Sequence, residues 1–172
     1  MTGRLKMNCG MRDVAAVADS GPLIGLAKID QLELLPALFA KVLVPPEVWS
    51  EVTVRGRHLP GADKVRGAEW LVIQEPDPQL VKPLSILVDA GEAQAIALAQ
   101  TTEGCTVLLD DSRARKIAER LGIKQIGTVG LLLRAKRRGL TEQIKPHLEA
   151  LIANRIYIRK ELLEAVLKEA EE

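Results

Sequence analysis

Short apolar runs alternate with stretches of helical periodicity over most of the chain. The runs are short enough for buried strands, and the stretches between them repeat apolar residues every three or four positions, which is typical of helices. Strands are predicted at residues 14–19, 41–46, 69–79, 105–111 and 123–127, with a short one at 155–158. Helices are predicted at residues 20–29, 30–39, 47–55, 112–122, 128–139, 141–153 and 160–172, and within 55–67 and 85–104.

Strands that alternate with helices predict a parallel sheet covered on both faces, a three-layer α/β/α sandwich. The 172 residues suit one domain with a full core. Residues 1–13 lack periodicity and are expected to form a flexible N-terminal tail. Residues 14–140 are expected to form the main part of the domain, and residues 141–172 a helical extension of it.

Three aspartates come at the ends of predicted strands. Asp19 ends the first strand, and the adjacent pair Asp110 and Asp111 ends the fourth. The carboxyl ends of parallel strands share one edge of the sheet, where the sites of such folds lie. Adjacent carboxylates repel each other unless a cation or a proton is shared between them. One helix cap would explain one aspartate of the pair and leave the other without a role.

The start of the helix at 20–29 leaves Asp19 available for a site. Ser20 or Gly21 is placed to cap this helix, with Pro22 at its first position. A strand-end turn or a helix cap is the alternative explanation for Asp19.

Two glutamates are further candidates. Glu92 is the one charged group on a face of small apolar residues, and Gly91 beside it allows close approach of another segment. A capping box with Asp89 is the alternative explanation. Glu51 is equally compatible with a site and with a solvated helix face, whereas Glu47, one turn earlier, is expected at the surface.

Carboxylates without a neighbouring histidine or cysteine suit a hard cation such as Mg²⁺ or Mn²⁺. Such a site serves phosphoester cleavage, because the metal lowers the pKa of a bound water and stabilises charge on the phosphate. The chain has no G-x-x-x-x-G-K-[ST], G-x-G-x-x-G or G-x-S-x-G motif, so nucleotide, dinucleotide and serine-esterase sites lose support. The late position of the acidic pair argues against a receiver-type phosphoacceptor domain.

Composition restricts the partners. The 24 Lys and Arg against 23 Asp and Glu give a net charge of +1, so a nucleic-acid site must be a local patch. Aromatic residues make up 2% of the chain, which disfavours folds that stack bases on aromatic platforms and favours contacts to phosphates. The two cysteines are isolated, and neither a secretory signal nor a membrane-spanning run is evident. A cytoplasmic protein without membrane contact is expected.

Five segments together resemble the PIN-domain family. They are VADSGPLIGLAKI, VPPEVWSEV, DAGEAQAIALA, LLDDSRARKIAERLGI and GTVGLLLRAKRRGL, spread over residues 14–140. More narrowly, they resemble prokaryotic PIN-like proteins similar to the toxins of VapC-type toxin–antitoxin pairs. Members of the family are compact α/β/α domains in which three or four acids bind Mg²⁺ or Mn²⁺ and single-stranded RNA is cut. The resemblance implies the same fold, cofactor and activity here.

By position, the resemblance assigns catalytic and metal-binding roles to Asp19, Glu92, Asp110 and Asp111, and a catalytic role to Glu51. Ser20 would add a hydroxyl that supports the metal ligands. Many relatives have Asp where this chain has Glu92. Relatives commonly have T-x-D at the last position, which favours Asp111, whereas the narrower branch favours Asp110, so both are kept.

Two basic clusters are candidates for phosphate contacts. Arg113, Arg115, Lys116 and Arg120 follow the acidic pair, and Arg134, Lys136, Arg137 and Arg138 end the helix at 128–139. An ordinary solvated helix face is the alternative for both clusters. Contacts to phosphates position a nucleic-acid strand without reading its base sequence.

The sequence thus predicts a metal-dependent endoribonuclease that cleaves single-stranded RNA. Further expectations are a role as the toxin of a type II toxin–antitoxin pair, a small antitoxin protein as partner, and a homodimer. The alternative is a PIN-like module that binds RNA or protein with weak or no catalysis. A pure RNA binder gains nothing from carboxylates that repel phosphate, which favours the nuclease.

Overall fold

The computed structural model describes residues 13–172 and has a five-stranded parallel sheet at its centre. The strands are β1 (Ala15–Ala18), β2 (Val42–Val44), β3 (Leu71–Ile73), β4 (Cys105–Leu108) and β5 (Lys124–Ile126). Their order is β3-β2-β1-β4-β5, so the chain moves outward from β1 in one direction and then returns to the other side of it. The reversal point lies between β1 and β4, and sites of such sheets form at the carboxyl edge of this point.

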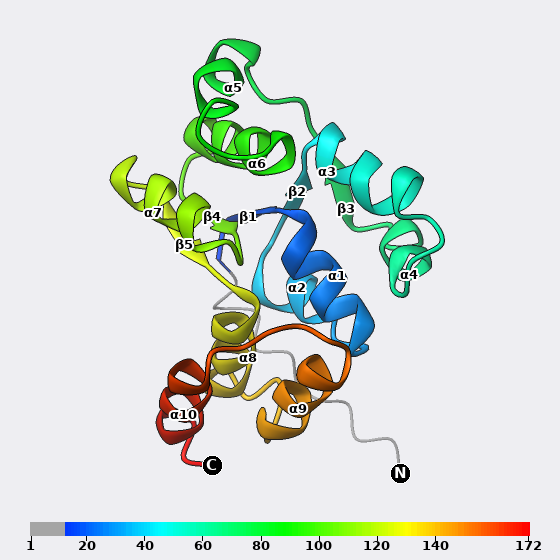
Figure 1. Cartoon of the computed structure of the whole chain (residues 1–172), viewed down its shortest axis with the longest axis vertical. Helices are drawn as coiled ribbons and strands as arrows, with labels where there is room; N and C mark the ends of the chain where they lie inside the picture. The colour runs from blue at the N-terminus through cyan, green and yellow to red at the C-terminus, as the bar shows by residue number, and fades with distance from the viewer. Residues whose placement is uncertain (1–12) are drawn as a thin grey trace.

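Helices cover both faces of the sheet (Figure 1), which confirms the predicted α/β/α sandwich. One face carries α1 (Ser20–Lys28), α2 (Leu34–Leu38), α3 (Pro46–Ser50) with the π-helical turn η1 (Glu51–Arg55), α4 (Ala62–Arg66), α8 (Thr128–Arg137), α9 (Lys145–Ala153) and α10 (Lys160–Glu169). The other carries α5 (Pro78–Leu84), α6 (Ala90–Thr101) and α7 (Ser112–Arg120). The central strands are buried on both sides because their residues are small and apolar.

The alanine-rich helix α6 packs between the sheet and α5. Its residues from Gly91 to Ala99 are buried, with the exception of Gln94, so small side chains are needed on almost every side. This arrangement brings the first turn of α6 to the carboxyl edge of the sheet.

Two predicted elements differ in the structure. Residues 69–79 were predicted as one strand ended by Pro76 and Pro78, whereas strand β3 covers only Leu71–Ile73 and residues 78–84 form helix α5. Asp77 caps α5 by accepting the N–H of Gln79, and Pro78 takes the first helical position, where its missing N–H costs nothing. The short strand predicted at 155–158 is wrong, because this extended segment pairs with no strand of residues 13–172.

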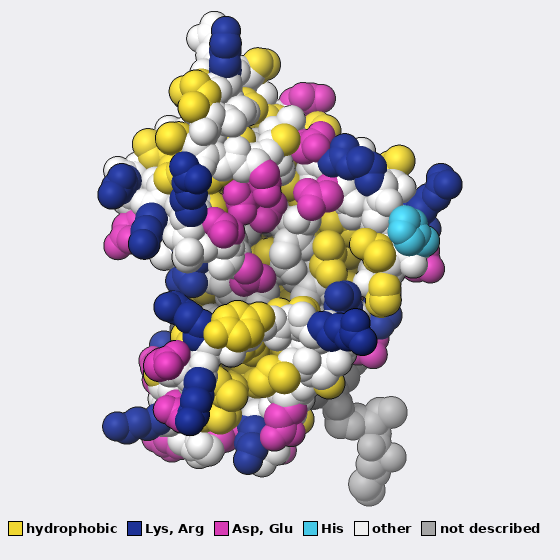
Figure 2. All heavy atoms as spheres, viewed as in Figure 1, with side chains coloured by type: hydrophobic (Ala, Val, Ile, Leu, Met, Phe, Trp, Pro, Cys, Tyr) yellow, Lys and Arg dark blue, Asp and Glu magenta, His cyan; other side chains and the backbone are white. Residues whose placement is uncertain are grey.

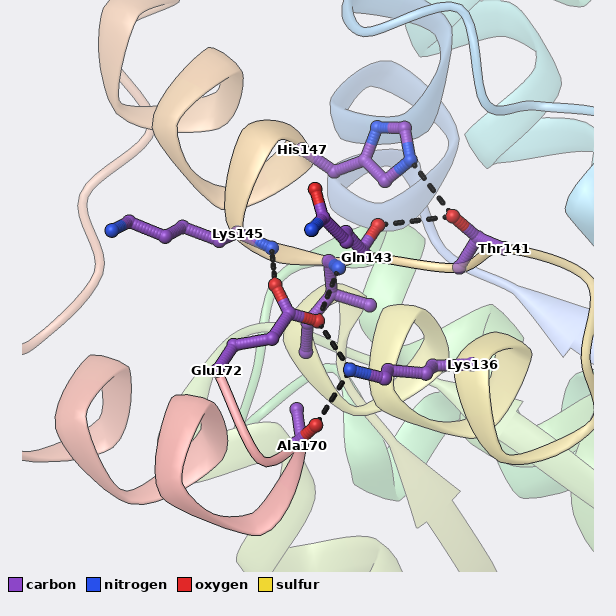
Figure 3. A network of polar contacts seen from close by, with 8 residues as sticks. Lys136, Thr141, Gln143, Lys145, His147, Ala170 and Glu172 are labelled. Carbon is purple, nitrogen blue, oxygen red and sulfur yellow. Dashed lines mark hydrogen bonds and ion pairs between the residues drawn. The ribbon is translucent and has the colours of Figure 1, made fainter.

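The residues that follow α10 hold α8 and α9 together (Figure 3). The Glu172 carboxylate accepts the N–H groups of Ile144 and Lys145, both at 2.8 Å, and binds the Lys136 ammonium at 2.6 Å. Burial acts to raise the pKa of Glu172, but these donors outweigh it and bring the pKa to about 2. Residues 141–172 are therefore fixed against the rest of the domain. Within residues 13–172, no helix is long and apolar enough to cross a membrane.

Candidate active site

Acidic side chains gather in the middle of the face shown in Figure 2, at the carboxyl edge of the sheet. A cavity of about 440 Å³ opens there, and its lining includes Asp89, Glu92, Asp111 and Arg113. The backbone N–H of Asp19 donates to the carbonyl of Leu108 in the neighbouring strand, at 3.1 Å. The strand ends predicted from sequence therefore do meet at one edge.

Asp19 is the most constrained acid of the site. Its side chain is 6% exposed, and its Oδ1 atom has no hydrogen-bond partner among the described residues. Burial raises its pKa to about 7, against the ordinary 3.8, and the carboxylates of Glu92, Asp89 and Glu51 add to the effect while the N–H of Ser20 opposes it. A buried carboxylate in this state needs a proton or a cation.

The cap predicted at the start of α1 is shifted. Asp19, in extended backbone, takes the N-cap position, α1 begins at Ser20, and Pro22 is its third residue. Ser20 does not cap the helix. Its hydroxyl instead donates to Oε1 of Glu51, at 3.2 Å, and so links α1 to the π-helical turn η1.

Glu51 and Asp19 meet over Gly91, the second residue of α6. A Cβ placed on Gly91 would lie 3.1 Å from Glu51 Oε2 and 3.4 Å from Asp19 Oδ1. The absence of a side chain at Gly91 therefore leaves room for both carboxylates. The sequence had predicted that another segment approaches closely at this glycine. Glu47, which was expected at the surface, forms an ion pair with Arg55 at 2.6 Å.

Glu92 forms the capping box that was the alternative explanation for it, and it also lies among the other acids of the candidate site. Asp89 Oδ1 accepts the N–H of Glu92 at 2.8 Å, and Glu92 Oε2 accepts the N–H of Asp89 at 3.3 Å, which is a capping box. Burial raises the pKa of Glu92, and the carboxylates of Asp89, Asp111 and Glu51 raise it further, against the N–H of Asp89. Asp89 is thus an acid of the site that sequence reasoning took only for a cap.

The two adjacent aspartates cap two different helices. Both carboxylate oxygens of Asp110 bind Thr128 at the start of α8, one accepting its N–H and the other its hydroxyl, each at 2.7 Å. Asp111 Oδ1 accepts the N–H groups of Arg113 and Ala114 at the start of α7, both at 2.9 Å. The expectation that capping could explain only one of them was wrong. Thr128, which is buried, was missed because nothing in the local pattern links it to Asp110.

The two basic clusters differ in their surroundings. Arg113 lines the acidic cavity, Arg115 donates to Gln125 at 2.6 Å, and Lys116 is exposed on α7. The cluster that ends α8 is committed to the fold: Arg134 and Arg138 pair with Asp13, Lys136 with Glu172 and Arg137 with Glu169. Only the first cluster stays a candidate for phosphate contacts.

Comparison with protein families matches residues 15–172 to the model of the PIN domain. The chain belongs to the PIN-domain family. PIN domains are generally nucleases, so the family supports a hydrolase and contact with nucleic acid at a coarse level. No curated protein matches the chain.

The acids of this PIN domain suit a divalent metal by their chemistry. PIN domains typically use divalent metals, and the donors here are carboxylate oxygens, one of them the buried and unpaired Oδ1 of Asp19. Within residues 13–172, no three His, Cys, Asp or Glu side chains are already placed to bind one ion together. Carboxylate oxygens are the ligands that a hard divalent cation prefers, with water at its remaining positions.

Replacing Gly91 with alanine is expected to lower nuclease activity roughly 10- to 100-fold without loss of stability. The added methyl would press on Glu51 Oε2 at 3.1 Å and shift it, and would touch Asp19 Oδ1 at 3.4 Å, and small misplacements at an active site have effects of this size. Alanine also favours the helix by about 1 kcal/mol. Cleavage rates and urea unfolding curves should be compared with those of Gly67→Ala, at the end of α4. Equal activity of the two variants would show that the position of these carboxylates is not critical.

Proposed function

We propose that this PIN domain is a metal-dependent endoribonuclease that cleaves phosphodiester bonds of single-stranded RNA. The observation that carries the proposal is the buried carboxylate of Asp19, unpaired at Oδ1 and surrounded by acids from other elements. A packing role would not require such a group, because burying it without a partner costs stability.

Asp19, Glu92, Asp110 and Asp111 would hold the metal. A bound Mg²⁺ or Mn²⁺ would supply a Lewis acid for the phosphate and lower the pKa of a water molecule. Ser20 orients Glu51 toward Asp19, and the capping box fixes Glu92 in place. Arg113, at the rim of the cavity, is placed to meet a phosphate.

A toxin role in a type II toxin–antitoxin pair, with a small antitoxin protein and a homodimer, is the narrower form of this proposal. Its support is the resemblance of the five sequence segments to VapC-type proteins. An apolar cavity of about 360 Å³, bordered by Leu84, Leu87 and Leu121, offers a surface for a protein partner.

The test is cleavage of a circular single-stranded RNA of mixed sequence by the purified chain. A circle has no ends, so every product requires an internal cut. We expect cleavage with Mg²⁺ or Mn²⁺ and none with EDTA. A circle left intact with both metals would reject the nuclease and favour the alternative, a binding module with weak or no catalysis.

A further inference from the structure

A third cavity, of about 560 Å³, begins at Asp110 and Asp111 and leads away from the acidic site. It passes the start of α8 and ends at the segment 156–159 and at α10. Figure 1 shows the connection from α9 to α10 crossing over α8, and Figure 2 shows hydrophobic and basic side chains below the acidic patch. We call this cavity the strap groove, after the segment 156–159.

The strap is anchored on alternate residues. Ile156 and Ile158 pack against the core, and the N–H of Ile156 donates to the carbonyl of Leu151 at 3.0 Å. Ile156 also lies close to Gly25 of α1, where a Cβ would be 3.7 Å from its Cδ1. The side chains of an extended segment alternate, so Tyr157 and Arg159 face the opposite way.

Tyr157 is 86% exposed, although its backbone neighbours are fixed. It is the single tyrosine of the chain. Tyr157 borders the strap groove, which reaches Asp110 and Asp111, so its exposed ring is accessible to a ligand bound in the groove.

Two arginines border the strap groove, together with the carboxylates of Asp110 and Asp111 at its acidic end and of Glu169 on α10. Neither Arg115 nor Arg159 forms an ion pair with a residue of 13–172, whereas Glu169 is paired with Arg137. Arg115 is held in place by Gln125. An exposed aromatic ring and two guanidinium groups without ion pairs, all bordering one groove, suit a chain that carries both bases and phosphates.

We propose that the strap groove binds the nucleic-acid strand next to the cleaved bond, with one base stacked on Tyr157 and phosphates at Arg115 and Arg159. This inference rests on the proposed function, since it takes the acidic site as the place of cleavage. The low aromatic content excludes a platform for several bases but not a single stacking position. Every base has a π-face, so the position contributes affinity without strong sequence preference.

The test is binding of a labelled oligoribonucleotide to the full chain, measured by fluorescence anisotropy in EDTA, where cleavage cannot interfere. Tyr157→Leu keeps an apolar side chain without a π-face and should raise the Kd roughly 5- to 150-fold. Tyr157→Phe should stay near the wild type. Arg159→Ala should weaken binding and reduce the slope of log K against log salt by about 0.7.

Val14→Ala is the matched control, because Val14 is 66% exposed and precedes β1, at the edge of the sheet opposite the acidic site. It should leave the Kd unchanged. Single-stranded DNA of the same sequence should depend on Tyr157 in the same way, and a duplex should not, since its bases are already stacked. Binding that is absent, or that responds to Val14→Ala and not to Tyr157→Leu, would overturn the inference.

Cleavage assays on the same variants separate this inference from the proposed function. Metal-dependent cleavage with an unchanged KM in Tyr157→Leu would reject the strap groove and keep the nuclease. Binding that depends on Tyr157, in a chain that cuts no RNA with either metal, would keep the groove and reject the nuclease.

Discussion

Substituting Asp19 by asparagine is expected to lower the rate of metal-dependent RNA cleavage roughly 100- to 1,000-fold. Asparagine keeps the size of the side chain and removes the charge that a divalent cation would bind. The Oδ1 atom of Asp19 has no hydrogen-bond partner among residues 13–172, so the substitution breaks no internal bond there. The measurement is the single-turnover rate of RNA cleavage at saturating enzyme.

Asp63→Asn is the control, because Asp63 has an 87% exposed side chain and pairs with Arg66 on α4. It should cleave RNA at the rate of the wild type. Cleavage that persists in Asp19→Asn would indicate a contaminating nuclease or an active site elsewhere.

The same assay distinguishes the two adjacent aspartates. In Asp110→Asn the amide can still accept from the N–H of Thr128, and in Asp111→Asn it can still cap α7, because asparagine is a good N-cap. Each substitution therefore removes a negative charge and can keep the hydrogen bonds that the side chain accepts from the backbone. The variant that loses more of the cleavage activity identifies the main metal ligand of the pair, which the sequence alone left open.

Much of the fold follows from local patterns in the sequence. The runs that end at Asp19 and Asp111 are strands β1 and β4 because their residues are apolar enough for burial on both faces. The helix of residues 78–84 was missed because Pro76 and Pro78 were taken only as the end of the preceding strand, although proline also fits the first turn of a helix. Packed and exposed side chains do alternate from Ile156 to Ile158. A strand also needs a neighbouring strand to pair with, and the pattern within one segment cannot show whether there is one.

The positions of the site residues could be predicted from the sequence where they depend only on the ends of strands. Asp19, Asp110 and Asp111 reach one edge because all strands run parallel. The bond from Thr128 to Asp110 could not be found this way, since it joins residues 18 positions apart and exists because β5 lies beside β4. Asp89 was visible as a cap, but its effect on the pKa of Asp19 depends on where α6 packs.

Asp19→Asn is also expected to stabilise the metal-free protein, by on the order of 4 kcal/mol at about pH 8. The pKa of Asp19 is about 7 in the folded chain, against an ordinary 3.8. Between these two values the folded chain binds more protons than the unfolded chain, so the wild type loses stability as the pH rises through this window. Above about pH 7 the loss is complete, and below about pH 4 it is absent.

Urea unfolding in EDTA at several pH values measures this difference, with Asp63→Asn again as the control for loss of an exposed charge. The free energy of unfolding of Asp19→Asn minus that of the wild type should rise with pH and level off above about pH 7. Adding Mg²⁺ or Mn²⁺ should then stabilise the wild type more than the variant. A ligand that binds only the folded state raises the free energy of unfolding, and it does so more when it binds more tightly. A difference that does not change with pH would show that the pKa of Asp19 in the folded chain is not raised above its ordinary value. A difference that changes with pH but not with metal would show that a proton alone satisfies the buried carboxylate.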